Sequence, residues 1–148
     1  MAVINYNDTN GGLLQAIIDA GHNIREIDGV MTSTNDVAVQ AIIDSYDALP
    51  YAKKLKRQEL RTEYRNRLIL IYPDAEDMTE SHFDVVIDIA FDVHRSVIAG
   101  SRSPNADWQN VLDTRIARRN ARQAINALTT VAAVEAYDVI NTPAWPVI

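Results

Sequence analysis

The residues of this chain whose side chains could do chemistry are few and widely spaced. It has three histidines, His22, His82 and His94, and no cysteine. His82 and His94 are about three helical turns apart, which is too far for both side chains to bind one ion. We therefore interpret the histidines as solvated or helix-capping residues. The lack of cysteine excludes disulfides and thiolate metal sites, and it fits assembly in a reducing cytoplasm.

The regularly spaced carboxylates Asp84, Asp88 and Asp92 are the groups that an enzyme of unrecognised type would use. Metal-dependent melting would be the sign of such an enzyme. The chain contains none of the motifs P-loop, GxGxxG, GxSxG or HExxH. The sequence therefore predicts no catalytic residue, no cofactor and no metal site.

The strongest pattern in the sequence is a pair of charge stripes of opposite sign. The basic stripe is Lys53, Arg57, Arg61 and Arg65, and the acidic stripe is Glu80, Asp84, Asp88 and Asp92. Residues four apart lie one above another on a helix, so each stripe follows one side of its helix. In an antiparallel helical hairpin around Pro73 the two stripes would meet in matched order. The predicted pairs are Arg65 with Glu80, Arg61 with Asp84, Arg57 with Asp88 and Lys53 with Asp92.

These stripes have two other readings. Two solvated helix faces would show the same pattern, and each exposed pair then contributes about 0–1 kcal/mol. A basic helix is also a footprint of nucleic-acid binding. However, the chain has a net charge of -6, and the acidic stripe is available to neutralise the basic one. We therefore do not expect a nucleic-acid partner, and we interpret the stripes as setting helix register or partner choice.

The elements that would carry these residues are mostly helices. Apolar spacing and turn signals predict helices at 13–20, 37–46, 50–72, 81–99, 106–128 and 131–139. Asn23–Ile27 and Val30–Thr32 flank Asp28-Gly29, the preferred pair for a tight hairpin turn. The predicted fold is mainly α, a helical hairpin or bundle with a small N-terminal β-hairpin and extended termini. Two similar segments, LQAIIDA at 14–20 and VQAIIDS at 39–45, present apolar ridges suited to packing on a helical hairpin or on a neighbouring subunit.

At 148 residues the chain is long enough for one domain with a single core. We expect an N-terminal arm, short helix and β-hairpin over 1–34, a helical core over 35–140 and an extended tail over 141–148. The longest apolar stretch, Val85–Val93, is interrupted by two aspartates, so no membrane span is predicted.

Two segments resemble proteins of tailed bacteriophages. Residues 39–68, VQAIIDSYDALPYAKKLKRQELRTEYRNRL, are similar to a segment of tail-fibre and related virion proteins. Residues 121–146, ARQAINALTTVAAVEAYDVINTPAWP, are similar to a second phrase of the same proteins, which ends in a Trp-Pro. The chain departs from a fibre because it lacks the Gly-, Thr- and Ser-rich β-repeats of a shaft.

The resemblance implies a structural component of a virion, at the neck, tail, baseplate or fibre attachment. Such a protein would have no enzymatic activity and no cofactor, and it would be assembled in the host cytoplasm. Its partners would be other copies of itself and other virion proteins, with no membrane. The alternative is a tail-fibre assembly chaperone or another interaction module.

The tail offers the last candidate site. Two prolines prevent a helix there and favour an extended segment, which loses little entropy when it docks. Trp145, followed by Pro146, provides the large apolar surface that anchors contacts. We expect Trp145 to occupy a groove, either on the protein's own helices or on an adjacent subunit. In the second case Met1–Tyr6 would be a further contact between subunits.

Overall fold

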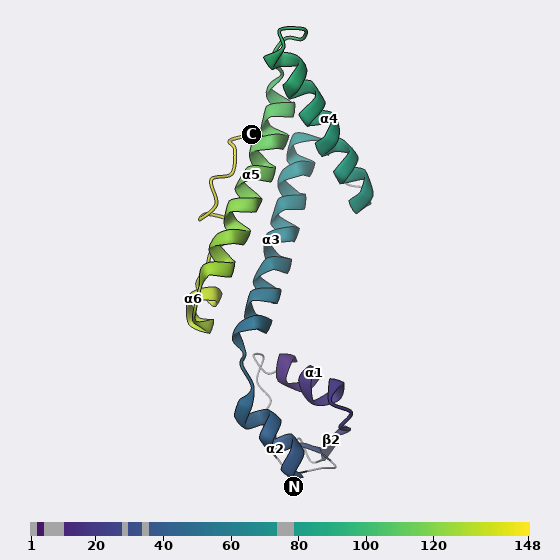
Figure 1. Cartoon of the computed structure of the whole chain (residues 1–148), viewed down its shortest axis with the longest axis vertical. Helices are drawn as coiled ribbons and strands as arrows, with labels where there is room; N and C mark the ends of the chain where they lie inside the picture. The colour runs from purple at the N-terminus through teal and green to yellow at the C-terminus, as the bar shows by residue number, and fades with distance from the viewer. Residues whose placement is uncertain (1–2, 5–10, 28–29, 34–35, 74–78) are drawn as a thin grey trace.

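The protein is elongated, with its long axis along a pair of helices (Figure 1). The structure, a computed structural model, describes residues 3–4, 11–27, 30–33, 36–73 and 79–148. The predicted turn at Asp28-Gly29 lies outside these residues. Helices account for most of what is described, which confirms the mainly α prediction.

The helices begin and end close to their predicted bounds. They are α1 (Gly11–Asp19), α2 (Asp36–Ser45), α3 (Leu49–Ile71), α4 (Glu80–Ile98), α5 (Ala106–Ala127) and α6 (Val131–Glu135). Only α6 is clearly shorter than expected, since a helix to Val139 was predicted. The Asp138 carboxylate accepts hydrogen bonds from the backbone N–H groups of Ile140 and Asn141. The side chain thereby holds these donors in a turn and favours a turn over a continued helix.

The N-terminal lobe contains a small antiparallel sheet and two helices. Strands β1 (Val3–Ile4), β2 (Ile24–Ile27) and β3 (Val30–Ser33) lie in the order β1-β3-β2. β2 pairs with β3 from Ile24 opposite Ser33 to Ile27 opposite Val30. The pairing of β2 with β3 lies where the sequence predicted a two-stranded hairpin, and β1 adds a third strand that was not predicted to pair with it.

The third strand also changes the expected role of the N-terminal arm. Val3 lies opposite Thr32 and Ile4 lies opposite Met31. The described part of the arm thus adds a strand to the sheet of its own chain. Under one of the two alternatives for the tail, the arm was expected to be a further contact between subunits.

The two similar segments, at 14–20 and 39–45, pack on one another. Leu13 and Ile17 of α1 form a buried cluster with Val39 of α2, and Ile42 and Ile43 pack against it. α2 was expected in the helical core over 35–140, but the helix lies in the N-terminal lobe (Figure 1). The reason is that its apolar ridge matches that of α1.

The remaining helices form a bundle in which α5 is central. α3 and α5 lie side by side and antiparallel, and α4 packs on α5 (Figure 1). The predicted hairpin of α3 and α4 is therefore wrong. α4 begins beside the middle of α3, runs in the same direction and continues past the end of α3, so its hairpin partner is α5 (Figure 1).

Two buried clusters hold the bundle together. The upper one joins three helices and contains Tyr64, Leu68, Ile71, Phe83, Ile87, Ala90, Val111 and Leu112. The lower one joins α3 and α5 through Leu60, Ala121 and Ile125. Since α4 contributes only to the upper cluster, the lower half of the α3–α5 pair is left uncovered by α4.

Side chains at the helix ends explain the boundaries. The Thr79 N–H donates to His82 Nδ1 (3.3 Å) at the start of α4, so one of the three histidines is a capping residue, as predicted. Asn105 Oδ1 accepts from the Trp108 N–H (3.0 Å) at the start of α5. Gly100, between α4 and α5, has a φ of 70°, which explains the glycine there.

Gly12 sets the distance between α1 and the beginning of α3. A Cβ atom at Gly12 would lie 2.4 Å from Tyr51 Cγ and 2.1 Å from the Tyr46 hydroxyl oxygen. Gly12→Ala is therefore expected to lower the free energy of unfolding by ~1–3 kcal/mol, although alanine favours a helix by about 1 kcal/mol over glycine. Chemical denaturation would measure this loss.

Gly11→Ala is the control for this prediction. A Cβ atom at Gly11 meets only the far end of the Tyr51 side chain, with its hydroxyl oxygen 2.9 Å away. The tyrosine can move aside at little cost. Equal stabilities of the two variants would show that the close approach at Gly12 has no energetic consequence.

Candidate interaction surface

The outer face of α4 combines acidic and apolar side chains. Asp88 and Asp92 point to solvent, and Asp92 forms an ion pair with Arg95 one turn later. On the same side of the helix Val85 is 54% exposed and Ile89 is 43% exposed. Exposed apolar residues next to charges are typical of a surface that contacts another protein.

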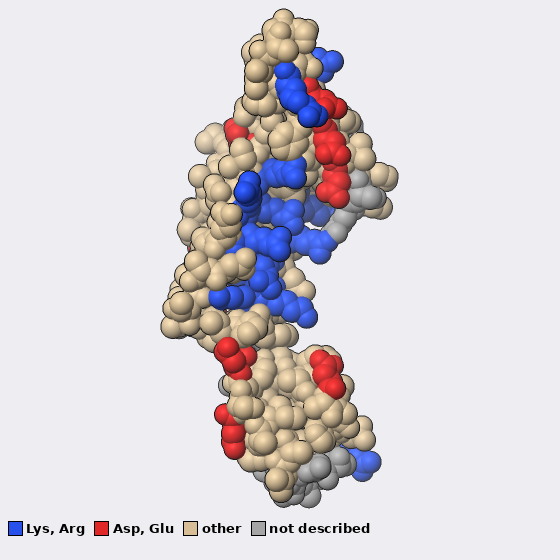
Figure 2. Space-filling view, viewed as in Figure 1, with Lys and Arg blue, Asp and Glu red and all other residues tan. Residues whose placement is uncertain are grey.

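The lower half of the α3–α5 pair has a strongly basic face. Its basic residues are Lys53, Lys54, Arg57, Arg61, Arg118, Arg119 and Arg122. The Lys53 ammonium donates to the Asn126 carbonyl (2.7 Å), and the Arg57 guanidinium donates to Asn126 Oδ1 (3.0 Å). Figure 2 shows basic side chains gathered over α3 and α5, with acidic side chains following α4 above them. We call these two surfaces the basic face and the acidic face.

The two stripes do not form the predicted ladder. Lys53 and Arg57 bond to Asn126, and Asp92 pairs with Arg95. The order of the ladder depended on antiparallel helices, whereas α3 and α4 run in the same direction (Figure 1). Two predicted pairs remain. Arg61 and Asp84 line one crevice, and the side chain of Glu80, the predicted partner of Arg65, lies outside the side chains that the structure describes.

This crevice lies where α4 diverges from α3 and α5. It has a volume of about 270 Å³ and is lined by Arg61, Thr62, Tyr64, Arg65, Leu68, Phe83, Asp84, Ile87 and Arg118. The Arg65 guanidinium lies 5.6 Å from the centre of the Phe83 ring, and that of Arg118 lies 4.5 Å from the Tyr64 ring. Such stacking orients a guanidinium while its edges remain able to donate to an anion.

Tyr64 is the buried polar residue of the crevice. It is 5% exposed, and its hydroxyl has no hydrogen-bond partner among the described residues. Burial raises the pKa of this hydroxyl, while the nearby guanidinium groups of Arg118 and Arg115 act in the opposite direction. Tyr64 is therefore neutral at physiological pH, and the positive charge of the crevice comes from its arginines.

The tail docks on its own chain. Trp145 packs against both buried clusters of the bundle, and its indole Nε1–H donates to the Val139 carbonyl (3.1 Å). The Arg67 guanidinium lies 5.9 Å from the centre of the indole ring. Pro146 lines a shallow pocket together with residues of α5. Of the two alternatives for the tail, the structure shows docking within the subunit.

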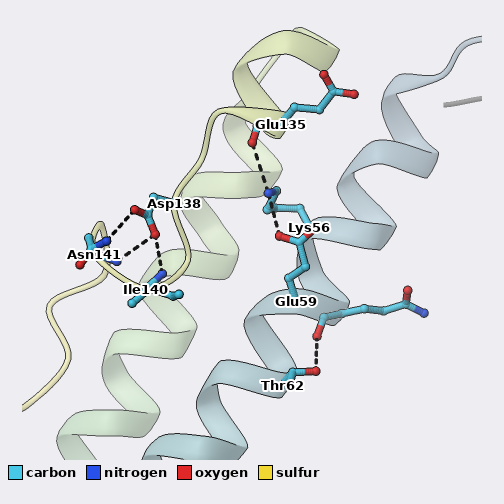
Figure 3. Close-up of polar contacts among 8 residues, drawn as sticks. Lys56, Glu59, Thr62, Glu135, Asp138, Ile140 and Asn141 are labelled. Atoms are coloured by element: carbon cyan, nitrogen blue, oxygen red, sulfur yellow. Dashed lines mark hydrogen bonds and ion pairs between the residues drawn. The ribbon is translucent and has the colours of Figure 1, made fainter. Parts of the chain in front are cut away.

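Polar contacts hold α6 and the following turn in place (Figure 3). The Lys56 ammonium donates to Glu59 Oε2 (2.7 Å) and to the Glu135 carbonyl (3.3 Å), so it joins α3 to the end of α6. The Asp138 carboxylate accepts from Ile140 N (2.8 Å), Asn141 N (3.1 Å) and Asn141 Nδ2 (2.7 Å). This turn directs the chain back toward the groove that Trp145 occupies.

The Asp138 turn is expected to weaken at low pH. Hydrogen bonds from Asn141 and Ile140 lower the pKa of this carboxyl below its ordinary value of 3.8. The folded protein thus binds the proton less tightly than the unfolded chain does. The stabilisation is fully present above pH 3.8 and is lost as the pH falls through the lowered pKa. At neutral pH the wild-type protein should have a larger free energy of unfolding than Asp138→Asn. This difference should shrink as the pH falls below 3.8. A pH-independent difference would contradict this expectation.

The described residues contain no group of three or more His, Asp or Glu side chains placed to hold a metal ion. Nor does any helix among them have the length and apolar character needed to cross a membrane. No protein-family model matches the chain, and no curated protein or solved structure shows significant similarity to it.

The contribution of α5 to the basic face was not predicted from the sequence. Arg115, Arg118, Arg119 and Arg122 follow the spacing i, i+3, i+4, i+7. This spacing places side chains on one side of a helix. The signal was therefore present, but only the packing of α5 beside α3 shows that it extends the basic stripe.

Proposed function

We propose that this chain is a non-enzymatic structural component of a tailed-phage virion, in the tail, fibre attachment, baseplate or neck. It acts through protein–protein contacts in an oligomer with itself and with other virion proteins, after synthesis in the host cytoplasm. The observation that carries the proposal is the presence of two separate, oppositely charged faces on one elongated helical bundle (Figure 2).

Exposed apolar residues support a role in protein contacts. Ile98 near the end of α4 is 74% exposed, and Leu70 near the end of α3 is 63% exposed. Single exposed residues of this kind are common, but here Val85 and Ile89 add an apolar pair on the same helix as Ile98. The resemblance of residues 39–68 and 121–146 to virion proteins gives the proposal its biological setting.

A tail-fibre assembly chaperone or another interaction module is the second candidate. It is favoured by the helical fold, because a fibre shaft is built from β-repeats and this sequence has only five glycines. Both candidates use the same surfaces. They differ in whether the protein remains in the finished particle.

Purified particles of the phage that encodes this chain separate the two candidates. Particles banded by density and washed in high salt would be analysed by quantitative mass spectrometry. The major capsid protein serves as positive control and a replication protein as negative control. A structural component is expected at a fixed number of copies per particle. Its presence in infected-cell extracts together with its loss from washed particles would overturn the proposal and leave the chaperone.

A further inference from the structure

We propose that two copies of this chain form an antiparallel two-fold dimer, in which the acidic face of each copy lies on the basic face of the other. This inference names the contact through which the oligomer of the proposed function would form. It rests on the proposal that the protein acts as an oligomer, and it does not depend on the position of that oligomer in a particle.

The basic face is a helix-binding surface that the chain covers only in part. α4 packs on the upper half of the α3–α5 pair, where Phe83 and Ile87 enter the buried cluster. The lower half, around Leu60 and Ala121, is covered by the tail and by residues that follow α6. On the side of α4 the pair instead presents basic side chains, of which Arg61 and Arg118 line the crevice beside Phe83 (Figure 2). A second helix placed below α4 would continue the packing that α4 begins.

The acidic face has the shape and charge of that helix. From Asp84 to Asp92 the carboxylates recur every four residues over about 12 Å of helix. On the basic face, Arg118 and Arg122 of α5 are likewise four residues apart, and Arg119 lies beside them. The two faces therefore carry opposite charges along one side of a helix.

A second copy explains the surface better than nucleic acid does. Nucleic acid would leave the acidic face of α4 uncovered, and the net charge of -6 would repel it. A protein partner also buries Val85 and Ile89, which lie beside the aspartates. The acidic and basic faces lie at different heights along the long axis on one side of the molecule (Figure 2). A two-fold rotation perpendicular to this axis brings each face onto its complement, so both contacts form at once and the assembly closes.

Charge reversal tests the contact with two variants of opposite design. Asp88→Lys with Asp92→Lys makes the acidic face basic, and Arg119→Glu with Arg122→Glu makes the basic face acidic; all four side chains are exposed. Reversing two charges is expected to raise the dissociation constant of the dimer by at least ~100-fold, because like charges then face each other. Asp19→Lys with Asp44→Lys, on exposed positions of α1 and α2, is the control with the same change in net charge as the Asp88/Asp92 variant.

Light scattering and circular dichroism at low salt give the readout. Wild type and the control are expected at twice the 16.5 kDa of one chain, and each reversed variant at 16.5 kDa with native helix content. An equimolar mixture of the two reversed variants is expected to recover the dimer, since each altered face then meets a complement. High salt should dissociate the wild-type dimer, because charges are screened beyond ~3 Å at 1 M.

Several results would overturn the contact. Wild type that stays at 16.5 kDa would do so, as would reversed variants that keep the wild-type mass. A mixture that remains monomeric would do so as well. Loss of duplex DNA binding in the Arg119/Arg122 variant of a monomeric protein would assign the basic face to nucleic acid. Each of these results leaves the virion measurement independent, because copies per particle are counted without reference to the dimer.

Discussion

Replacement of Leu68 by alanine is expected to lower the free energy of unfolding by about 2–5 kcal/mol. Leu68 is 2% exposed and lies in the upper cluster, where side chains of α3, α4 and α5 meet. Alanine would remove apolar contacts with all three helices and leave a cavity that neighbouring side chains fill only partly. Urea denaturation followed by circular dichroism would measure the change.

Leu70→Ala is the matched control for Leu68→Ala. It removes the same atoms from the same helix, but Leu70 is 63% exposed. We expect its effect to remain within about 0.5 kcal/mol, as is usual for surface positions. A Leu70→Ala loss equal to that of Leu68→Ala would mean that the helix presents a different side to the bundle.

Trp145→Ala is expected to cost about 2–3 kcal/mol, which is less than the ~3–5 kcal/mol of a fully buried tryptophan because the indole is only partly covered. The indole packs on both clusters of the bundle and donates to the Val139 carbonyl. Its loss therefore loosens the tail and both clusters together. The melting temperature should fall, and the tail should become accessible to protease in the native state.

Val147→Ala provides the comparison within the tail. Val147 is 96% exposed, so this change should leave the melting temperature unaltered. The mass of the Trp145→Ala protein is informative too. A variant of unchanged stability that loses its oligomer would show that the indole serves another subunit, against the docking seen in the structure.

Much of the fold could be predicted from local signals in the sequence. Apolar periodicity gave all of the helices with small errors at their ends, since a helix face must be apolar where it packs. Turn and cap residues gave the boundaries, for example Asn105 before α5 and Gly100 after α4. These signals act over a few residues, so one sequence is enough to read them.

The arrangement of the helices could not be predicted in the same way. An ion-pair ladder with matched spacing favoured a hairpin of α3 and α4, but exposed ion pairs contribute little compared with burial. The apolar residues Phe83, Ile87 and Ala90 decide the arrangement, because they pack with Val111 and Leu112 of α5. Nothing local indicates that choice of partner, which depends on which apolar faces fit together.

The candidate surface could be predicted only in part, because part of it also depends on which helices pack together. The acidic stripe and half of the basic face lie on single helices and are visible as i+4 spacing. The other half, Arg118, Arg119 and Arg122, joins the surface only through the contact of α5 with α3. Trp145 was recognised as an anchor from its residue type. The place where it docks depends on the turn at Asp138, whose hydrogen bonds are specific to the folded chain.

The proposed dimer requires this protein to bind a second copy of itself. The most direct measurement is the mass of the unmodified chain in solution at low salt, by sedimentation equilibrium over a range of concentrations. We expect a concentration-dependent rise from 16.5 kDa to twice that mass, with no further growth because a two-fold contact is closed. A mass of 16.5 kDa at every concentration would contradict the contact between copies.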